Sequence, residues 1–165
     1  MTTTLDTYDL KLLAAIQHNA KTPQSELGEI ANLSTAAVNR RLKHLGEEGF
    51  IERYTAVLSP DALGYGLTII STVEMESEQI DQLDATRRTF RACPNVQQCY
   101  YVTGEWDFVL VFVVRNMEQY NQLTRELFFG TGKVKRFKTL VAMGRDKVGL
   151  DIPIAQDRAD TLGDA

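Results

Sequence analysis

Cysteine is scarce in this chain of 165 residues, and its two cysteines lack the spacing of a redox or metal site. Cys93 and Cys99 enclose a segment that contains Pro94, which fits neither a CxxC pair nor a zinc ribbon. Long apolar runs are missing, and the N-terminus lacks the basic start and apolar centre of a secretory signal. We therefore expect a cytoplasmic protein with reduced thiols, no bound metal and no membrane partner.

Groups that commonly carry catalysis are also rare. The only two histidines are His18 and His44, and the chain contains no HExxH, no GxSxG and no Walker loop. The sequence therefore predicts that the protein is not an enzyme and that it carries no cofactor.

Positive charge is in slight deficit, with 18 basic against 22 acidic residues and a formal net charge of -4. One segment departs from this balance, because Arg40, Arg41 and Lys43 lie between Ser34 and Leu45 without an acidic residue among them. A weakly acidic chain can still bind nucleic acid when its cations are gathered on the helix that docks.

Apolar residues between Leu5 and Leu45 recur at helical spacing in three groups. Asp6 and Ser34 stand where they could cap the first and third helices. The following segment, 50–59, alternates loosely as a short β ribbon would. Three helices with a tight turn before the last one, followed by a ribbon, predict a winged helix-turn-helix whose third helix enters the major groove of DNA.

The third helix has an exposed face suited to DNA. If its apolar residues form the buried stripe, the opposite face carries short polar side chains that could approach base edges and long cations that could reach phosphates or a guanine. The predicted DNA-contacting residues are Ser34, Thr35, Ala36, Asn39, Arg40, Arg41, Lys43 and His44. Arg41 lies nearer the buried stripe and could brace the domain instead. The alternative for the whole face is an ordinary solvated surface.

After a connection rich in proline and glycine, the pattern changes to strand, helix, strand, strand, helix, strand. This order predicts a ferredoxin-like βαββαβ domain, with both helices on one face of an antiparallel sheet, and an α+β fold for the chain. The segment 107–114 is apolar on both faces, which predicts a homodimer through the open face of the sheet. The expected domains are 1–58 for DNA binding, 59–66 as linker, 67–146 for effector binding and oligomerisation, and 147–165 as a fraying tail.

Several segments together resemble the Lrp/AsnC (leucine-responsive, feast/famine) family of transcription factors. They are "LDTYDLKLL", "ELGEIANLSTAAVNRRLKHLGEEGFIERYTAVLSPDALG", "YYVTGEWDFVLVFVV" and "VKRFKTLVA". The resemblance implies that the first domain binds double-stranded operator DNA. It also implies that the second domain, the RAM domain, binds a small-molecule effector, commonly an amino acid, and assembles dimers into octamers.

The resemblance also implies an effector site. The implied residues are the turn Gly104, Glu105, Trp106 and Asp107, with Phe137, Thr139 and Val141 in the last strand. Phe137 stands where many relatives have the first threonine of Thr-x-Thr, which implies a larger or more apolar ligand, or a filled pocket. Independently of the resemblance, backbone amides near Gly104 could bind a carboxylate, and Glu105 or Asp107 could bind an ammonium group. A plain β-hairpin is the alternative for this turn.

Two other functions compete with this interpretation. Some proteins of this architecture resemble siroheme decarboxylases, but both histidines of this chain fall in the first domain, which leaves no imidazole for a tetrapyrrole site. The chain could also be an effector-sensing oligomer that does not bind DNA.

Overall fold

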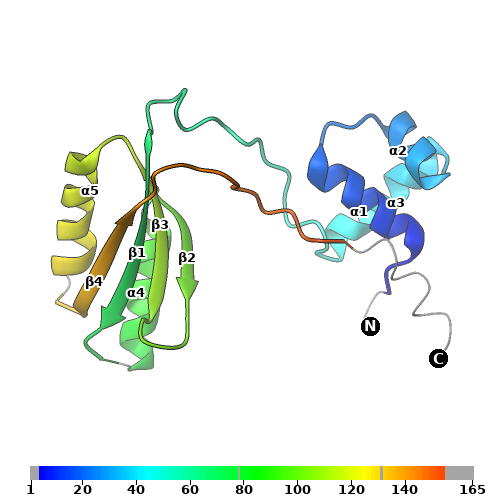
Figure 1. Ribbon diagram of the computed structural model, residues 1–165. Coiled ribbons are helices and arrows are strands. Elements are labelled where there is room, and N and C mark those ends of the chain that lie inside the picture. Colours follow the sequence, from blue (N-terminus) through cyan, green and yellow to red (C-terminus); the bar gives the residue numbers. More distant parts are fainter. Residues whose placement is uncertain (1–3, 78, 131, 155–165) are drawn as a thin grey trace. The chain divides into compact units, whose positions relative to one another are not determined.

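The computed structural model describes residues 4–77, 79–130 and 132–154 of the chain. These residues form two compact units (Figure 1). The first runs up to Val57 and includes the segment from Gly149 onward, and the second runs from Leu58 to Val148. No helix in the described ranges is long and apolar enough to cross a membrane.

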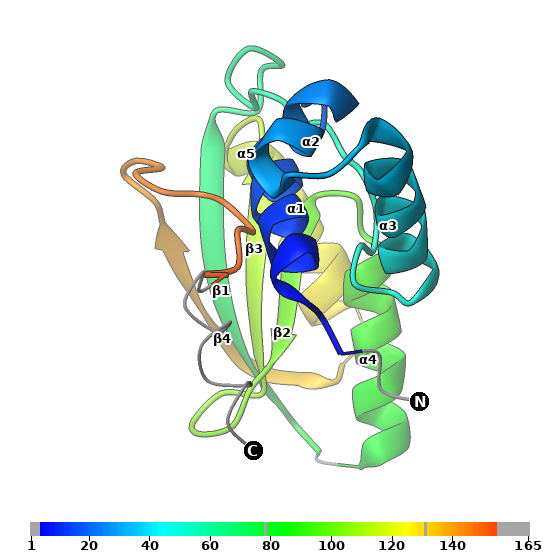
Figure 2. The same cartoon turned by 90° about the vertical axis from the view of Figure 1, so that its right-hand side faces the viewer.

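Three helices build the first unit (Figure 2). They are α1 (Thr7–His18), α2 (Gln24–Ala31) and α3 (Thr35–Glu47). Asp6 caps α1 in a reciprocal capping box with Asp9, and Ser34 caps α3 by accepting a hydrogen bond from the Ala37 amide at 3.3 Å. Both caps agree with the sequence prediction.

The three helices share one apolar core. Leu12 and Leu27 are buried in it together with Val38 of α3, and Leu42 packs against it while half-buried. Leu45, the next member of the predicted α3 stripe, is also buried. Burying one such side chain contributes about 1.5–3 kcal/mol, so this core fixes which face of α3 points outward.

The turn between α2 and α3 depends on a glycine. Asn32 ends α2 in the left-handed region with φ 52°, and the Leu33 amide donates to the Gly28 carbonyl at 2.8 Å. A Cβ atom at position 28 would lie 2.6 Å from the Leu33 carbonyl oxygen, closer than nonbonded atoms can approach. Only glycine therefore allows the chain to turn this tightly.

The segment after α3 contains no strand. Residues 50–59 are all described and none of them is in a β ladder, so the prediction of a β ribbon is wrong. The amides of Phe50 and Ile51 donate to the Leu45 carbonyl at 2.9 and 3.2 Å, and the chain then continues to Ser59 without regular secondary structure. A loosely alternating pattern does not make a ribbon without a second strand to supply the ladder hydrogen bonds.

Part of the predicted tail is fixed to α1. The Gln17 side chain donates to the Ile152 carbonyl at 3.0 Å and accepts from the Ile152 amide at 3.1 Å. This paired contact resembles one rung of a β ladder and holds Ile152 beside α1, in a segment that was predicted to fray. The remainder of that prediction, from residue 155, lies outside the described residues.

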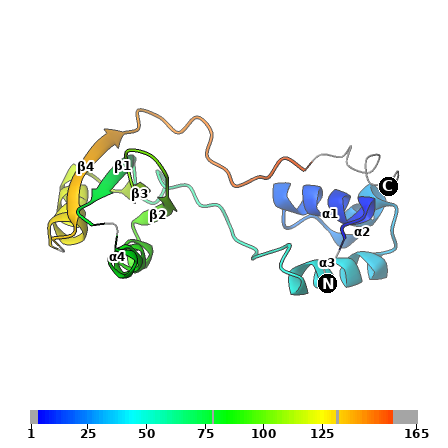
Figure 3. The same cartoon turned by 90° about the horizontal axis from the view of Figure 1, so that it is seen from below.

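The second unit is a four-stranded antiparallel sheet with two helices (Figure 1). Its elements are β1 (Leu67–Met75), α4 (Ile80–Ala92), β2 (Val96–Tyr101), β3 (Phe108–Val114), α5 (Met117–Thr124), the π-helical turn η1 (Arg125–Phe129) and β4 (Val134–Val141). The strand order is β2-β3-β1-β4, and Figure 3 shows both helices on one side of the sheet. This is the predicted ferredoxin-like arrangement.

Aromatic rings fill the space between the sheet and its helices. Phe90 of α4 meets Phe108 of β3 and Phe128 of η1 edge to face, with ring centroids 5.4 and 5.9 Å apart. Ile80, the first residue of α4, is 76% exposed, and the buried stripe of this helix starts at Leu83.

The opposite face of the sheet carries half-buried apolar residues. Val109 and Val111 of β3 lie beside Thr72 and Ile70 of β1, and all four alternate with residues that point toward the helices. Neither α4 nor α5 covers this face (Figure 3). The apolar pattern on both sides of β3 is therefore present as predicted.

Gly28→Ala is expected to destabilise the first unit by about 1–3 kcal/mol, because the new Cβ forces the turn backbone apart. Gly46→Ala is the matched control, since a Cβ at this α3 position meets nothing within 4 Å and alanine favours the helix by up to about 1 kcal/mol. Hydrogen exchange of peptides from α1 to α3 is the measurement, because the single tryptophan, Trp106, reports only on the second unit. Equal protection in the two variants would contradict the expectation.

Arg41 ties α3 to the start of α1. Its Nη1 lies 2.8 Å from both the Asp6 and the Asp9 carboxylates, and its guanidinium lies over the Tyr8 ring at 5.4 Å from the centroid. Partial burial raises the pKa of Asp6, but the hydrogen bonds from the Asp9 amide and from Arg41 outweigh it and leave this pKa below its usual value. The contribution of Asp6 to stability is thus complete above about pH 4 and is lost as the pH falls below that value.

We expect Arg41→Ala to cost the first unit about 1 kcal/mol at pH 7, discounted for the partial exposure of the ion pairs, and much less at pH 3. The exposed Arg40→Ala is the control and should change stability by less than about 0.5 kcal/mol at either pH. Hydrogen exchange of α1 and α3 peptides at the two pH values tests this. A cost for Arg41→Ala that is unchanged at pH 3 would show that the ion pairs are not its cause.

Candidate nucleic-acid interface and effector turn

Most of the predicted DNA-contacting residues lie together on the exposed surface of α3 and its cap. They are Ser34, Thr35, Ala36, Asn39, Arg40, Lys43 and His44. Buried Val38 and Leu45 fix the opposite side of the helix in the core, so the 3.6-residue period turns this set outward.

Arg41 departs from this group. Its side chain is 28% exposed, and its guanidinium is held by Asp6 and Asp9 of the α1 start. Arg41 therefore has the bracing role that its place beside the buried stripe allowed, and we leave it out of the proposed DNA contacts.

The two cations that remain are accessible. Arg40 is exposed, and Lys43 forms only a long ion pair of 3.7 Å with Glu47, in which both side chains are more than half exposed. A surface pair of this kind contributes between nothing and about 1 kcal/mol, so it does not prevent Lys43 from reaching a phosphate.

A groove runs between α3 and the segment that follows it. Asn39, Lys43 and Gly46 line one side, while Arg53 and Tyr54 line the other. The segment therefore borders α3, although it contains no strand, and it adds to the groove one cation, Arg53, and one acid, Glu52, that the sequence prediction did not include.

Asn39 also has a partner that the sequence prediction missed. Gln24, the first residue of α2, donates a hydrogen bond from Nε2 to Asn39 Oδ1, and both side chains are exposed. The only local signal was the position of Gln24 directly after Pro23 at a helix start, which does not by itself name a partner.

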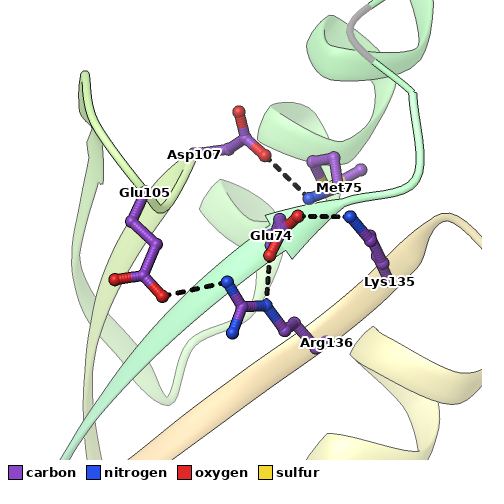
Figure 4. Close-up of polar contacts among 6 residues, drawn as sticks. All are labelled: Glu74, Met75, Glu105, Asp107, Lys135 and Arg136. Carbon is purple, nitrogen blue, oxygen red and sulfur yellow. Dashed lines mark hydrogen bonds and ion pairs between the residues drawn. The ribbon is translucent and has the colours of Figure 1, made fainter.

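The predicted effector turn is a hairpin between β2 and β3. Gly104 has φ 118°, a conformation that side chains rarely allow, and the Val102 amide donates to the Asp107 carbonyl at 2.9 Å. One carboxylate oxygen of Asp107 accepts from the Met75 amide at 2.7 Å (Figure 4). Asp107 thus anchors the turn to β1.

Arg136 of β4 occupies the acidic side of this turn (Figure 4). Its guanidinium donates to Glu105 at 2.9 Å and pairs with Glu74. It also lies over the Trp106 ring at 4.6 Å from the centroid. Hydrogen bonds from Lys135 and Arg136 hold the pKa of Glu74 below its usual range. The sequence prediction missed Arg136 because the register that sets it opposite Glu74 cannot be counted from one chain segment.

The β4 members of the predicted effector set face the other way. Phe137, Thr139 and Val141 are paired with β1 residues whose side chains point toward the helices. Phe137 packs on Phe128 with ring centroids 4.7 Å apart. Within one chain the structure therefore does not bring the turn residues and these strand residues into one site.

A hydroxyl chain and a small cavity lie on that helix side. Tyr120 of α5 shares hydrogen bonds with Ser71 at 2.8 Å and with Thr139 at 2.7 Å. The adjacent cavity of about 360 Å³ is lined by Tyr120, Thr139 and Phe137 together with Arg125. The ring of Phe137 occupies space beside this cavity that the smaller side chain of a threonine would leave open.

Comparison with known proteins adds independent findings. The chain matches the family model for a winged helix-turn-helix DNA-binding domain over residues 5–52 and that for the Lrp/AsnC ligand binding domain over residues 68–149. An HTH-type transcriptional regulator of Sinorhizobium fredii is 39% identical over 150 residues, which span 91% of this chain and 89% of the relative. The leucine-responsive regulatory protein of Rhizobium meliloti is 29% identical over 91% of this chain and 96% of its own length.

Solved structures of transcriptional regulators have the same fold as this chain. A transcriptional regulator of Neisseria meningitidis in complex with L-methionine superposes with a TM-score of 0.85 at 27% identity, covering 91% of this chain and 97% of the other. An AsnC family regulator of Agrobacterium tumefaciens, at 23% identity, has the same fold with a TM-score of 0.85 over 90% of this chain and 97% of the other. These relatives are named as regulators and not as enzymes, which confirms the non-enzymatic prediction. The chain belongs to the Lrp/AsnC family of helix-turn-helix transcriptional regulators.

Proposed function

We propose that the protein binds operator DNA in a sequence-specific manner through the exposed face of α3, and that an amino-acid effector changes its DNA affinity or its assembly. The observation that carries the DNA part is the pair of accessible cations, Arg40 and Lys43, on a helix whose opposite side is fixed in the core. Both reach outward from the helix that follows the tight turn, which is the docking element of a helix-turn-helix.

The overall negative charge is compatible with this role. Phosphate contacts act over short distances because salt screens charges beyond about 8–10 Å, so local placement matters more than net charge. A homodimer presents two α3 helices to two half-sites and compensates for the small number of cations on each. Assembly of such dimers into an octamer, as the family resemblance implies, would add further contacts.

The open sheet face supports the homodimer. Val109, Val111 and Ile70 are half-buried there, beside the exposed Tyr100 and Leu140 of the edge strands. Covering apolar surface contributes about 25 cal/mol for each square ångström, which favours a second copy of the same face as its cover.

The effector part is supported by the turn and by the L-methionine complex of the Neisseria relative. Asp107 provides a carboxylate for an α-ammonium group, while Arg136 provides a cation for an α-carboxylate. Since Arg136 is paired with Glu105, an amino acid must either join this network or displace one of its members. A partner subunit would have to bring Phe137, Thr139 and Val141 to the same effector.

The combined change Arg40→Ala and Lys43→Ala is expected to abolish the gel shift of the DNA upstream of the gene that encodes this chain. In fluorescence anisotropy at several salt concentrations, loss of two phosphate contacts should lower the salt slope by about 2 for each bound subunit. The matched control, Arg88→Ala with Arg91→Ala, removes the same charge from exposed positions of α4 and should bind nearly as the parent does. Wild-type affinity in the α3 variant would favour an effector-sensing oligomer without DNA binding.

Asp107→Asn is expected to weaken effector binding at least tenfold while leaving basal DNA binding unchanged, because asparagine can still accept from the Met75 amide but carries no charge. A thermal-shift titration with L-methionine and then with the other amino acids supplies the measurement, since a ligand of the folded state raises its melting temperature. Asp81→Asn on the exposed start of α4 is the matched control. An unchanged titration in Asp107→Asn would remove Asp107 from the effector site.

A further inference from the structure

The hydrogen bond between Gln24 and Asn39 joins the two halves of the helix-turn-helix on its outer side. Gln24 is the first residue of α2, and Asn39 lies in the second turn of α3, next to Arg40. Gln24 Nε2 donates and Asn39 Oδ1 accepts, so a residue of the neighbouring helix favours the orientation of the Asn39 amide in which Oδ1 faces Gln24.

Fold stability does not account for this contact. Both side chains are exposed, where a hydrogen bond between amides replaces bonds to water and restricts two flexible side chains. The two residues also line the same groove, together with Leu42 and Lys43. The contact instead orients a polar group on the face that carries Arg40.

In this orientation the Asn39 amide has a defined hydrogen-bonding pattern. Asn39 Oδ1 has a second lone pair beyond the one that Gln24 uses, and Nδ2 has two hydrogens. The outward pattern is therefore one acceptor beside one donor. In the major groove adenine presents N7 as acceptor and N6 as donor, which matches both groups at once, whereas guanine presents two acceptors and cytosine a donor alone.

We propose that Asn39 reads one adenine in each half-site of the operator and that Gln24 is a positioning residue that holds the Asn39 amide for this contact. The inference rests on the proposed function, because it requires α3 to dock in the major groove. Arg40 and Lys43 then set the register on the phosphates, while Asn39 contributes to the choice of sequence.

The experiment begins with selection of binding sites from a random duplex library by the full-length protein. Affinities for the selected site and for each of its single-base variants are then measured by fluorescence anisotropy at one salt concentration. For the parent protein we expect at least one position at which adenine is preferred over the other bases by about 5- to 150-fold. Asn39→Ala should reduce this preference to within about twofold at that position and leave the preferences at the other positions intact.

Variants of Gln24 separate positioning from a general structural role. Gln24→Glu has the same shape but cannot donate, so the Asn39 amide is expected to turn its Nδ2 toward the carboxylate and lose the adenine preference. Gln24→Lys keeps a donor of similar reach and should retain the preference. Arg40→Ala is the control that lowers affinity for all sequences alike, because a phosphate contact carries no base identity.

The experiment distinguishes failure of the proposed function from failure of the roles assigned to Asn39 and Gln24. If the parent protein binds no duplex, the proposed function is overturned and this inference with it. If it binds but Asn39→Ala keeps every base preference, or weakens all sequences equally, Asn39 does not read a base. A preference for guanine at the Asn39 position would overturn the assignment of adenine. Equal base preferences in Gln24→Glu and Gln24→Lys would remove Gln24 from the positioning role.

Discussion

The close approach of the Gly28 position to the Leu33 carbonyl is the constraint on which the DNA-binding unit depends. Without a Cβ at this position, α2 and α3 can be joined by a turn of three residues with Asn32 in the left-handed conformation. The turn brings the start of α2 beside the second turn of α3, which is why Gln24 can reach Asn39. The outward face of α3 is thus set by backbone geometry before any charge is considered.

The cations of α3 fall into two groups, one that stabilises the fold and one that is proposed to contact DNA. Three cations occur within four residues of the helix, yet the core determines that they have different environments. Arg41 is directed toward the acidic start of α1 and stabilises the unit, whereas Arg40 and Lys43 are directed to solvent. An acidic protein can therefore present a basic docking surface, because Asp6 and Asp9 are engaged by Arg41, and Glu47 forms only a long and exposed ion pair with Lys43.

The second unit uses the two faces of its sheet for different purposes. Residues facing the helices form an aromatic core and the hydroxyl chain through Tyr120, while the other face of β1 and β3 is the one proposed to meet a second subunit. Arg136, in the edge strand β4, connects this strand to the hairpin turn through Glu105. An effector that joined this network would change contacts between strands and turn, which gives ligand binding a physical route to subunit assembly.

The sequence by itself determined the elements whose signals are local. Helix caps at Asp6 and Ser34, the strands of the second unit and the basic helix depend on neighbours within a few residues, and these were predicted. The alternation in 50–59 is also local, but it forms no strand because no second strand supplies the ladder hydrogen bonds. Tertiary structure alone decided the partners that are distant in sequence: Asn39 with Gln24 across 15 residues, Arg41 with Asp9 across 32, and Arg136 with Glu74 across 62. These pairs depend on helix packing and strand register, because a side chain finds its partner only after the core has fixed which way its element faces.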